Sequence, residues 1–307
     1  MSFSFQIHHN LQFDHNEEVL KIADDNTPEL FHTPKTKVHF VKCVKDPEKL
    51  GGWGVQQVET DWARAYGKGD SLILDFGEHI TGTFSIDMTS SGSPMDAPLY
   101  IAVKFCEMAC EIEEDSSTYE GWLSSSWFQE ERIHKDVLPC TLQLERRYSF
   151  RYVRIDILDT SPKWKVVFAH PVADAISSAK EAEIPCMEDV QLQKIYSTGL
   201  HTLHECMQDV FEDGPKRDRR LWLGDLRLQA LSNYASYRQT DIVKRCIALF
   251  CGMRCKDGRV PANVFVKPAY IPDDTFLYDY SLFLISTVYD YIHETKDIPF
   301  LKTIYPV

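Results

Sequence analysis

Short runs of apolar residues typical of β-strands recur before residue 180, mainly from residue 71 onward, while residues 1–60 hold only two weaker runs, Val38–Val41 and Val55–Val58. Alternation of apolar and polar residues is clearest in Arg151–Leu158, where Val153, Ile155 and Ile157 share one face. Similar short runs, bounded by Gly and Ser clusters, recur about every ten residues with no helical runs between them. This spacing predicts an antiparallel, jelly-roll-like β-sandwich domain over residues 1–178.

Beyond residue 180 the period of the apolar positions becomes helical, close to 3.6 residues. We expect helices joined by short loops, with no strands between them, in a bundle or an α/α barrel over residues 179–307. Five helices are too few for a closed barrel of twelve, so we expect a truncated form of a longer protein; a small complete bundle is the alternative. The expected helices are Glu188–Val210, Arg219–Arg238, Asp241–Cys255 with Thr240 as its N-cap, Phe276–Thr295, and a fifth from about Pro299.

Composition narrows the classes of function. The formal net charge is −13 and basic residues form no stripe, which argues against a nucleic-acid partner and against an anionic membrane surface. No apolar run has the length of a membrane helix or a signal peptide. The nine cysteines lack the spacing of metal ligands, so we expect free thiols in a reducing cytoplasm, with no metal and no cofactor. A neutral substrate such as a sugar suits this surface.

The segment Asp213–Asp225 mixes charged residues with an indole and two glycines. If a helix begins near Lys216, then Asp218, Trp222, Asp225 and Gln229 lie on one helical stripe. An indole can stack on the apolar face of a sugar, while carboxylates and an amide hold its hydroxyls. Asp213 precedes the helix and can point into the same concavity. The alternative is a solvated, ion-paired helix start.

The same segment, Asp213-Gly-Pro-Lys-Arg-Asp-Arg-Arg-Leu-Trp-Leu-Gly-Asp225, resembles the signature of glycoside hydrolase family 78, the α-L-rhamnosidases. The resemblance implies a β-sandwich followed by an (α/α)6 barrel and a hydrolase acting on terminal α-L-rhamnosyl or related deoxysugar linkages. Weaker motifs agree in their order along the chain: Leu74–Gly82, Arg147–Val153, Tyr278–Tyr280, Tyr289–Asp297 and Tyr305-Pro306.

The resemblance also implies roles for single residues. The resemblance implies an inverting mechanism, in which a carboxylic acid protonates the leaving oxygen and a carboxylate base activates water. Asp218 matches the general acid. The residues that match substrate-binding positions are Asp213, Arg217, Trp222, Asp225 and Asp279, although for Asp279 a buried or capping role is an equal alternative.

Two departures from the family pattern bear on catalysis. The acid is usually Glu, one methylene longer than Asp218, and in a second alignment Asp218 matches the residue before the acid, which is then missing. The family's base comes from a later helix, beyond Val307. The chain is therefore expected to carry the general-acid half of the site.

Two other interpretations stay open: a non-catalytic carbohydrate-binding protein and a degenerate family member. Four tryptophans of the β region can form a sugar-binding surface, although packing is the commoner role: Trp53, Trp62, Trp122 and Trp127. His201 and His204, three residues apart, are expected on a helix face rather than at a metal. The sequence predicts no oligomeric state.

Overall fold

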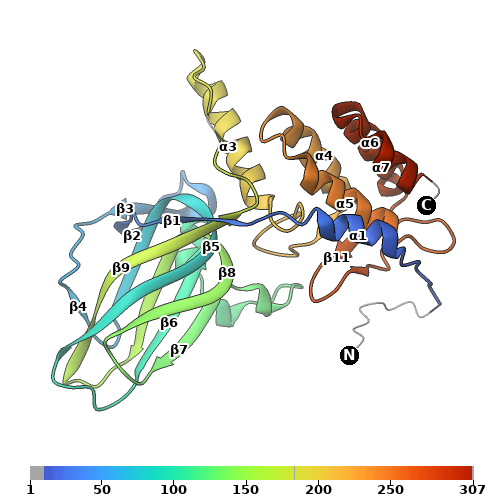
Figure 1. Ribbon diagram of the computed structural model, residues 1–307. Helices are drawn as coiled ribbons and strands as arrows, with labels where there is room; N and C mark the ends of the chain where they lie inside the picture. The colour runs from blue at the N-terminus through green and yellow to red at the C-terminus, as the bar shows by residue number, and fades with distance from the viewer. Residues whose placement is uncertain (1–9, 183, 306–307) are drawn as a thin grey trace. The chain divides into compact units, whose positions relative to one another are not determined.

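The computed structural model describes residues 10–182 and 184–305. The chain divides into two compact units, whose elements are labelled in Figure 1. One unit, the β domain, comprises residues 32–176. The other, the helical domain, combines residues 10–31 with residues 177–182 and 184–305. An antiparallel β domain followed by a helical domain is thus confirmed.

The β domain is built on a sheet of nine strands, with the order β1-β9-β5-β8-β6-β7; β2 adds to β5, β3 to β2 and β4 to β9. The pairings of β5 with β8 and β9 are antiparallel, and their register shifts at irregularities in the long β5. Short helices α2, η1, η2 and η3 lie in its connections. The strands are β1 (Phe31–Lys35), β2 (His39–Lys45), β3 (Trp53–Gln57), β4 (Ala65–Tyr66), β5 (Ser71–Gly92), β6 (Leu99–Cys106), β7 (Glu130–Lys135), β8 (Cys140–Asp159) and β9 (Trp164–Ser177); the helices are η1 (Leu50–Gly52), α2 (Ala109–Glu113), η2 (Ser116–Thr118) and η3 (Ser125–Trp127).

The alternation along the strands sorts side chains into two apolar clusters. Val153, Ile155 and Ile157 lie together in the larger cluster, as predicted, among edge-to-face aromatic rings such as Phe84 and Phe105, whose centroids are 5.6 Å apart. The neighbouring residue Tyr152 belongs instead to a small cluster beside α2. Successive side chains of one strand point to opposite faces, so both clusters follow from the same sequence pattern.

Two motifs of the β domain are joined by an ion pair. Arg151 donates to both carboxylate oxygens of Asp75, over 2.8 and 2.9 Å. Asp75 is 6% exposed and also accepts from the backbone N of Gly77, where φ is 80°. Glycine adopts this left-handed backbone without strain. The Asp-Phe-Gly turn and the Phe-Arg-Tyr strand are therefore fixed against each other by a bidentate contact.

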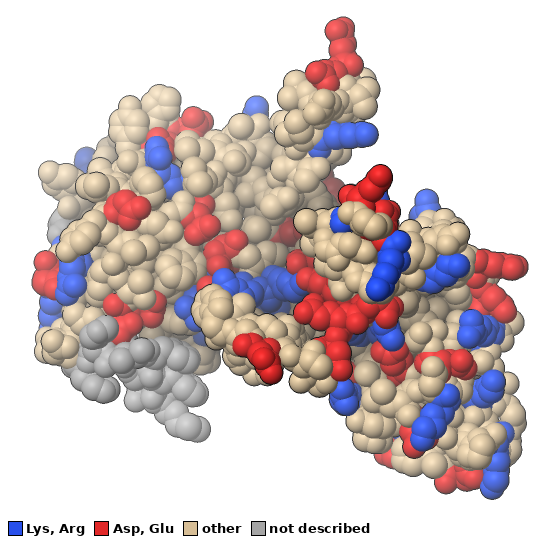
Figure 2. All heavy atoms as spheres, turned by 180° about the vertical axis from the view of Figure 1, so that it is seen from behind, with Lys and Arg blue, Asp and Glu red and all other residues tan. Residues whose placement is uncertain are grey.

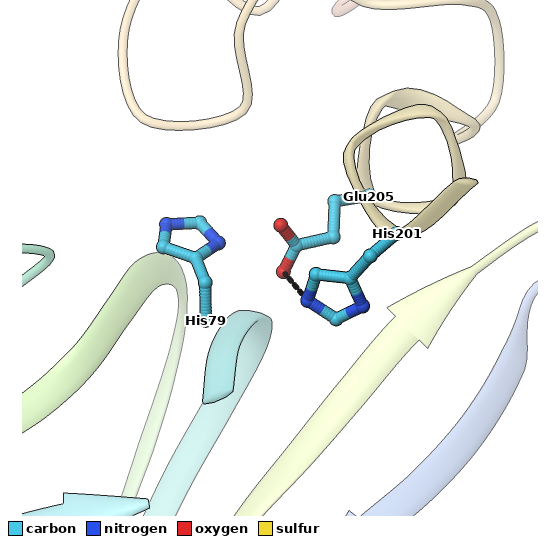
Figure 3. A group of neighbouring side chains, drawn as sticks. All are labelled: His79, His201 and Glu205. Atoms are coloured by element: carbon cyan, nitrogen blue, oxygen red, sulfur yellow. Dashed lines mark ion pairs between the residues drawn. The ribbon is translucent and has the colours of Figure 1, made fainter. Parts of the chain in front are cut away.

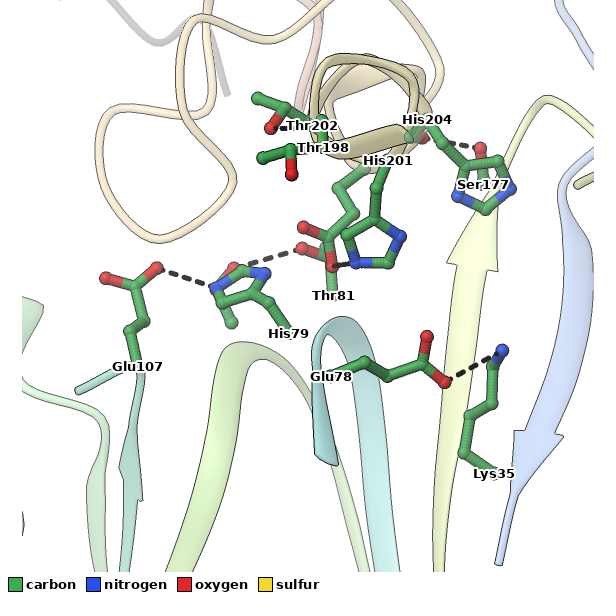
Figure 4. A network of polar contacts seen from close by, with 12 residues as sticks. Lys35, Glu78, His79, Thr81, Glu107, Ser177, Thr198, His201, Thr202 and His204 are labelled. Atoms are coloured by element: carbon green, nitrogen blue, oxygen red, sulfur yellow. Dashed lines mark hydrogen bonds and ion pairs between the residues drawn. The ribbon is translucent and has the colours of Figure 1, made fainter. Parts of the chain in front are cut away.

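Two ion pairs also hold the turn that follows Gly77. Figure 4 shows Glu78 beside Lys35, with Nζ and Oε1 3.1 Å apart, and His79 beside Glu107, with Nε2 and Oε1 2.9 Å apart. These pairs link β5 to β1 and to the end of β6.

We predict that Asp75→Ala destabilises the β domain by about 2 kcal/mol, because it leaves the half-buried Arg151 guanidinium and the Gly77 amide without their acceptor. Urea denaturation followed by circular dichroism measures the change. Asp96→Ala is the matched control, since it removes only exposed contacts with Lys163 and Ser161 and is expected to leave the midpoint unchanged. Equal midpoints for both variants would refute the role of the Asp75–Arg151 pair.

The helical domain contains six helices and a small sheet, β10-β11-β12, among its described residues. Helix α5 is buried along nearly its whole length and forms the centre of the core. Its N-cap is Gln239, with Thr240 as the first helical residue rather than the cap. The helices are α1 (Glu17–Asp25), α3 (Val190–Cys206), α4 (Leu223–Ala235), α5 (Thr240–Gly252), α6 (Tyr278–Thr295) and α7 (Ile298–Ile304); the strands are β10 (Leu221–Trp222), β11 (Asn263–Phe265) and β12 (Ile271–Pro272).

Residues 10–31 belong to the helical domain, whereas the sequence pattern predicts that residues 1–178 lie together in the sandwich. Asn16 caps α1, its Oδ1 accepting from the backbone N of Val19 over 3.2 Å. Val19 and Ala23 are buried in the helical core. The backbone N of Asn16 donates to the carbonyl of Gly252 at the end of α5, over 2.9 Å. The stability of an amphipathic helix comes mostly from packing of its apolar face, and the apolar face of α1 packs in the core formed around α5.

The strands β10, β11 and β12 correct a second expectation, that no strands separate the helices. Because these strands are only two or three residues long, no alternation of apolar and polar residues marks them in the sequence. Their pairing joins the segment before α4 to the segment before α6.

Apolar side chains lie exposed along three helices of this domain. Leu228 and Leu231 of α4 are 66% and 40% exposed, and this helix buries Leu226 and Ala230 instead. A groove of about 550 Å³ separates α3 from α4. Others in the exposed set are Val190, Leu192 and Ile195 of α3 and Leu282, Ile285 and Tyr289 of α6.

Charge is spread over the surface. On the face shown in Figure 2, acidic side chains gather in one group near the middle of the view, and elsewhere acidic and basic side chains are interspersed. None of the described helices combines the length and apolar character needed to cross a bilayer.

Candidate functional site

The charged segment after Asp213 is a closed loop, not a helix. The backbone N of Asp213 donates to the carbonyl of Arg220, and the backbone N of Arg220 donates to Oδ1 of Asp213, both over 3.0 Å. Asp218 and Arg219 have φ values of 60° and 54°. Left-handed backbone at two successive residues ends any right-handed helix. The predicted helical stripe from Asp218 to Gln229 is therefore wrong, because α4 begins only at Leu223.

Three carboxyl groups nevertheless come together at this loop. The pKa of Asp213 is raised to about 6, mainly by burial and also by the charges of Asp218 and Asp225, against the lowering effect of the backbone donors of Arg220 and Gly214. Burial also raises the pKa of Asp225, in the first turn of α4. Half-buried carboxyls that interact electrostatically are typical of acid–base sites.

Trp222 and Tyr280 form the aromatic part of the site. Their rings are edge-to-face, with centroids 6.3 Å apart and planes at 89°. Gly224 leaves room for this contact, since a Cβ there would lie 2.5 Å from the Tyr280 ring. The pKa of Tyr280 is raised by burial first and then by the charges of Asp225, Asp279 and Asp213. Tyr280 was not predicted; its signal was its place beside Asp279 in the Tyr-Asp-Tyr motif.

We predict that Gly224→Ala destabilises the protein by about 1–3 kcal/mol, because the added methyl displaces the Tyr280 ring. Thermal unfolding measures the loss. Gly199→Ala is the matched control: Gly199 lies within α3 and an added Cβ meets nothing within 4 Å. That variant is expected to stabilise the helix by up to about 1 kcal/mol. A Gly224→Ala protein as stable as wild type would mean that Tyr280 does not depend on this glycine.

The other predicted residues lie at the rim. Arg217 is exposed, with Nε 4.0 Å from Oδ1 of Asp218. Asp279 is exposed in the first turn of α6, and its Oδ1 accepts from the backbone N of Tyr280 over 3.1 Å. Gln229 lies one turn beyond Asp225 on α4, and its Nε2 donates to the carbonyl of Glu212 over 2.9 Å. The site thus gathers Asp213, Asp218, Trp222, Asp225 and Tyr280, with Arg217 and Asp279 at its edge.

Two polar residues near Trp222 were missed. Asn263 pairs with Trp222 between β10 and β11 and is fully buried. Its Nδ2 donates to Oδ2 of Asp273 over 2.8 Å. No local pattern marks such a pairing between segments some forty residues apart.

The histidines of α3 serve the fold. Figure 3 shows His201 beside Glu205, one helical turn away, with Nε2 and Oε1 3.8 Å apart. Burial lowers the pKa of His204, whose Nε2 lies 2.9 Å from the carbonyl of Ala179. The Ser177 hydroxyl donates to the carbonyl of His204 over 2.6 Å, as Figure 4 shows.

The four tryptophans of the β domain do not share one environment. The Trp62 ring packs edge-to-face on Phe40, at 4.6 Å, against the core. Trp53 lies under the ammonium group of Lys45, and Trp127 is half-buried. Trp122, in contrast, is 89% exposed.

Comparison with known proteins relates both domains to one family. Residues 37–175 match the glycosyl hydrolase family 78 alpha-rhamnosidase N-terminal domain. Residues 180–307 match the bacterial alpha-L-rhamnosidase 6 hairpin glycosidase domain. A search among curated proteins found no match.

Solved structures agree. A rhamnosidase from Klebsiella oxytoca with rhamnose bound is 41% identical, with a TM-score of 0.93; the match covers 96% of this chain and 58% of that one. Family 78 rhamnosidase of Bacillus sp. GL1 shares the fold at 21% identity, with a TM-score of 0.61 over 77% of this chain and 23% of that one. The α-L-rhamnosidase from Dictyoglomus thermophilum also shares the fold, at 17% identity and a TM-score of 0.59. The match covers 91% of this chain and 28% of that one.

The chain thus spans little more than half the length of the Klebsiella enzyme. Two adjoining family domains match in the order that the sequence motifs predict. The chain belongs to glycoside hydrolase family 78.

Proposed function

We propose that this protein is a glycoside hydrolase that cleaves terminal α-L-rhamnosyl, or related deoxysugar, linkages. The observation that carries the proposal is the gathering of Asp213, Asp218 and Asp225 beside Trp222 and Tyr280. Carboxyl groups bind sugar hydroxyls and transfer protons, while an aromatic ring packs against the apolar face of the sugar. The rhamnose bound to the Klebsiella relative supports the choice of sugar.

In the proposed mechanism Asp218 is the general acid of an inverting reaction. It donates its proton to the glycosidic oxygen as the bond to the anomeric carbon breaks, while a base on the opposite face of the ring activates water. Asp213, Arg217, Asp225 and Asp279 bind hydroxyls. Trp222 packs against the ring. Residues 179–307 supply the acid-bearing part of the catalytic barrel in this proposal.

The left-handed backbone at Asp218 favours this role. A loop residue with positive φ is held by its surroundings, here by the closure between Asp213 and Arg220. The loop therefore presents the Asp218 carboxyl in one orientation, with the Arg217 guanidinium beside it. Such fixed placement contributes to catalysis because a displacement of about 1 Å costs about a hundredfold in rate.

The test is hydrolysis of a panel of aryl glycosides by the protein at its full natural length, together with calorimetric titration of L-rhamnose. We expect release of the aryl group from the α-L-rhamnoside and binding of L-rhamnose. A folded protein that cleaves no member of the panel and binds no rhamnose would refute the proposal.

A sugar-binding role for the β domain is the second candidate, and the exposed Trp122 favours it. It predicts sugar binding that survives Asp218→Asn and is lost in Trp122→Ala. The hydrolase predicts that binding survives Trp122→Ala and that Asp218→Asn loses hydrolysis, so titration of Trp122→Ala and rate measurements on Asp218→Asn separate the two functions.

We also infer a reducing compartment, such as the cytoplasm. All nine cysteines are free thiols, and burial raises the pKa of Cys206, Cys246 and Cys251 to about 12. Thiols of this kind are inert and pack as small apolar groups. Disulfides found by peptide mapping of the natural protein would contradict this placement.

A further inference from the structure

The small sheet of the helical domain aligns three side chains. Trp222 lies opposite Asn263 between β10 and β11. The register of β11 on β12 places Asp273 opposite Asn263, and the backbone N of Asp273 donates to the carbonyl of Asn263 over 3.1 Å. Directly opposed residues of antiparallel strands share one face. Trp222, Asn263 and Asp273 therefore form a row, called here the Trp222–Asn263–Asp273 row.

Asn263 is the centre of this row and has 0% exposure. Its Nδ2 is satisfied by Asp273. Its Oδ1 and Nε1 of Trp222 are both buried without a hydrogen-bond partner among the described residues. An indole N–H only donates and an amide oxygen only accepts, so these two atoms are complementary. Leaving either group unsatisfied destabilises the fold, and an apolar residue at position 263 would avoid that cost.

The row adjoins the carboxyl cluster. The backbone N of Leu223 donates to the carbonyl of Ala262 over 3.0 Å, which ties the start of α4 to the residue before Asn263. Trp222 also contacts Tyr280, and the charges of Asp225 and Asp213 contribute to raising the pKa of the Tyr280 hydroxyl. A change in the orientation of the indole is thereby transmitted to the proposed sugar site.

We propose that Asn263 is a positioning residue of the sugar site, an inference that rests on the proposed function. Its Nδ2 holds the carboxylate of Asp273, and its pairing with Trp222 across β10 and β11 fixes the position of the indole. The apolar face of a deoxysugar ring packs on this indole, and the half-buried Asp273 accepts a hydrogen bond from a ring hydroxyl.

Calorimetric titration of L-rhamnose tests the proposal. We expect Asn263→Ala to weaken binding by about tenfold, the effect of losing one ordinary hydrogen-bonded contact. Asn233→Ala is the matched control. Asn233 is also a fully buried asparagine of the helical domain, but its amide bonds to backbone groups of Gln239. Asn233→Ala is expected to lower stability and to leave the dissociation constant of rhamnose unchanged.

The Asn263→Asp variant tests the role of Asn263 through the pH dependence of rhamnose binding, which a loss of packing alone would not change. It places a second carboxyl at hydrogen-bond distance from Asp273, and the two carboxyls cannot both ionise without repulsion. We expect rhamnose binding that is weak at neutral pH, relative to wild type at the same pH, and that approaches the wild-type affinity as the pH falls and the pair shares a proton. Asn233→Asp is expected to show no such recovery.

The outcomes separate the two proposals. Wild-type protein that binds rhamnose, with folded Asn263→Ala and Asn263→Asp variants that bind it equally well at every pH, overturns the role of Asn263 alone. Folded wild-type protein that binds no rhamnose overturns the proposed function and this inference with it. If Asn263→Ala does not fold, the pH dependence of Asn263→Asp decides.

Discussion

Asp218→Asn is expected to slow the hydrolysis of an alkyl α-L-rhamnoside by about 10²–10⁴-fold, the usual contribution of a general acid. The loss should be much smaller for a nitrophenyl rhamnoside, because nitrophenolate leaves without needing a proton. Steady-state kinetics on both substrates measure the difference. Asp218→Glu, which restores the residue usual in the family, is expected to retain far more activity than Asp218→Asn.

The control for this experiment is Asp241→Asn, which removes an exposed carboxylate from the first turn of α5 in the same domain. It is expected to leave both rates unchanged. If Asp218→Asn slows both substrates equally, Asp218 binds the sugar but does not protonate the leaving oxygen. If neither rate changes, the assignment of Asp218 as the acid is wrong.

Asp213→Asn is expected to stabilise the protein at pH 7 while weakening rhamnose binding by about ten- to a hundredfold, the loss of a hydrogen bond to a charged group. The folded pKa of Asp213 is about 6, above the ordinary value of 3.8. Folding therefore favours the protonated carboxyl, and the charged form is destabilising. This penalty is absent below about pH 3.8, grows between 3.8 and 6, and is complete above 6.

The size of the gain follows from that shift. About two pKa units correspond to about 3 kcal/mol in full, which solvent screening reduces to about 1 kcal/mol because the carboxyl is only half-buried. Asparagine keeps an oxygen to accept from the Arg220 amide. Urea denaturation of wild type and variant at pH 4 and pH 7 measures the difference, which should vanish at pH 4. A variant less stable than wild type at pH 7 would show that the Asp213 charge stabilises the fold.

Much of the architecture follows from period alone. Alternation from residue 151 to 158 placed Val153, Ile155 and Ile157 in one cluster, and the helical period located α3, α5 and α6 to within a few residues. Helix α1 was missed although its signals are local. Asn16 stands at an N-cap position, and Val19 and Ala23 are spaced for one helical face.

The start of α4 could not be read from the sequence in the same way. Its charged residues are compatible with a helix, but Asp213 has a side chain that competes for backbone amides and closes the loop on Arg220. The carboxyl cluster was still anticipated, because its members lie within one short motif. Asn263 and Tyr280 depend on contacts between distant segments, which one sequence does not reveal.

The exposed apolar faces of α3, α4 and α6 have a calorimetric consequence. The heat capacity increases on unfolding because apolar surface becomes hydrated, typically by about 12–15 cal/mol/K per residue. Side chains such as Leu228, Ile285 and Tyr289 are already hydrated in the folded chain. Unfolding therefore adds less apolar surface per residue in the helical domain than in the β domain, and the stability of the helical domain should vary with temperature along a flatter curve.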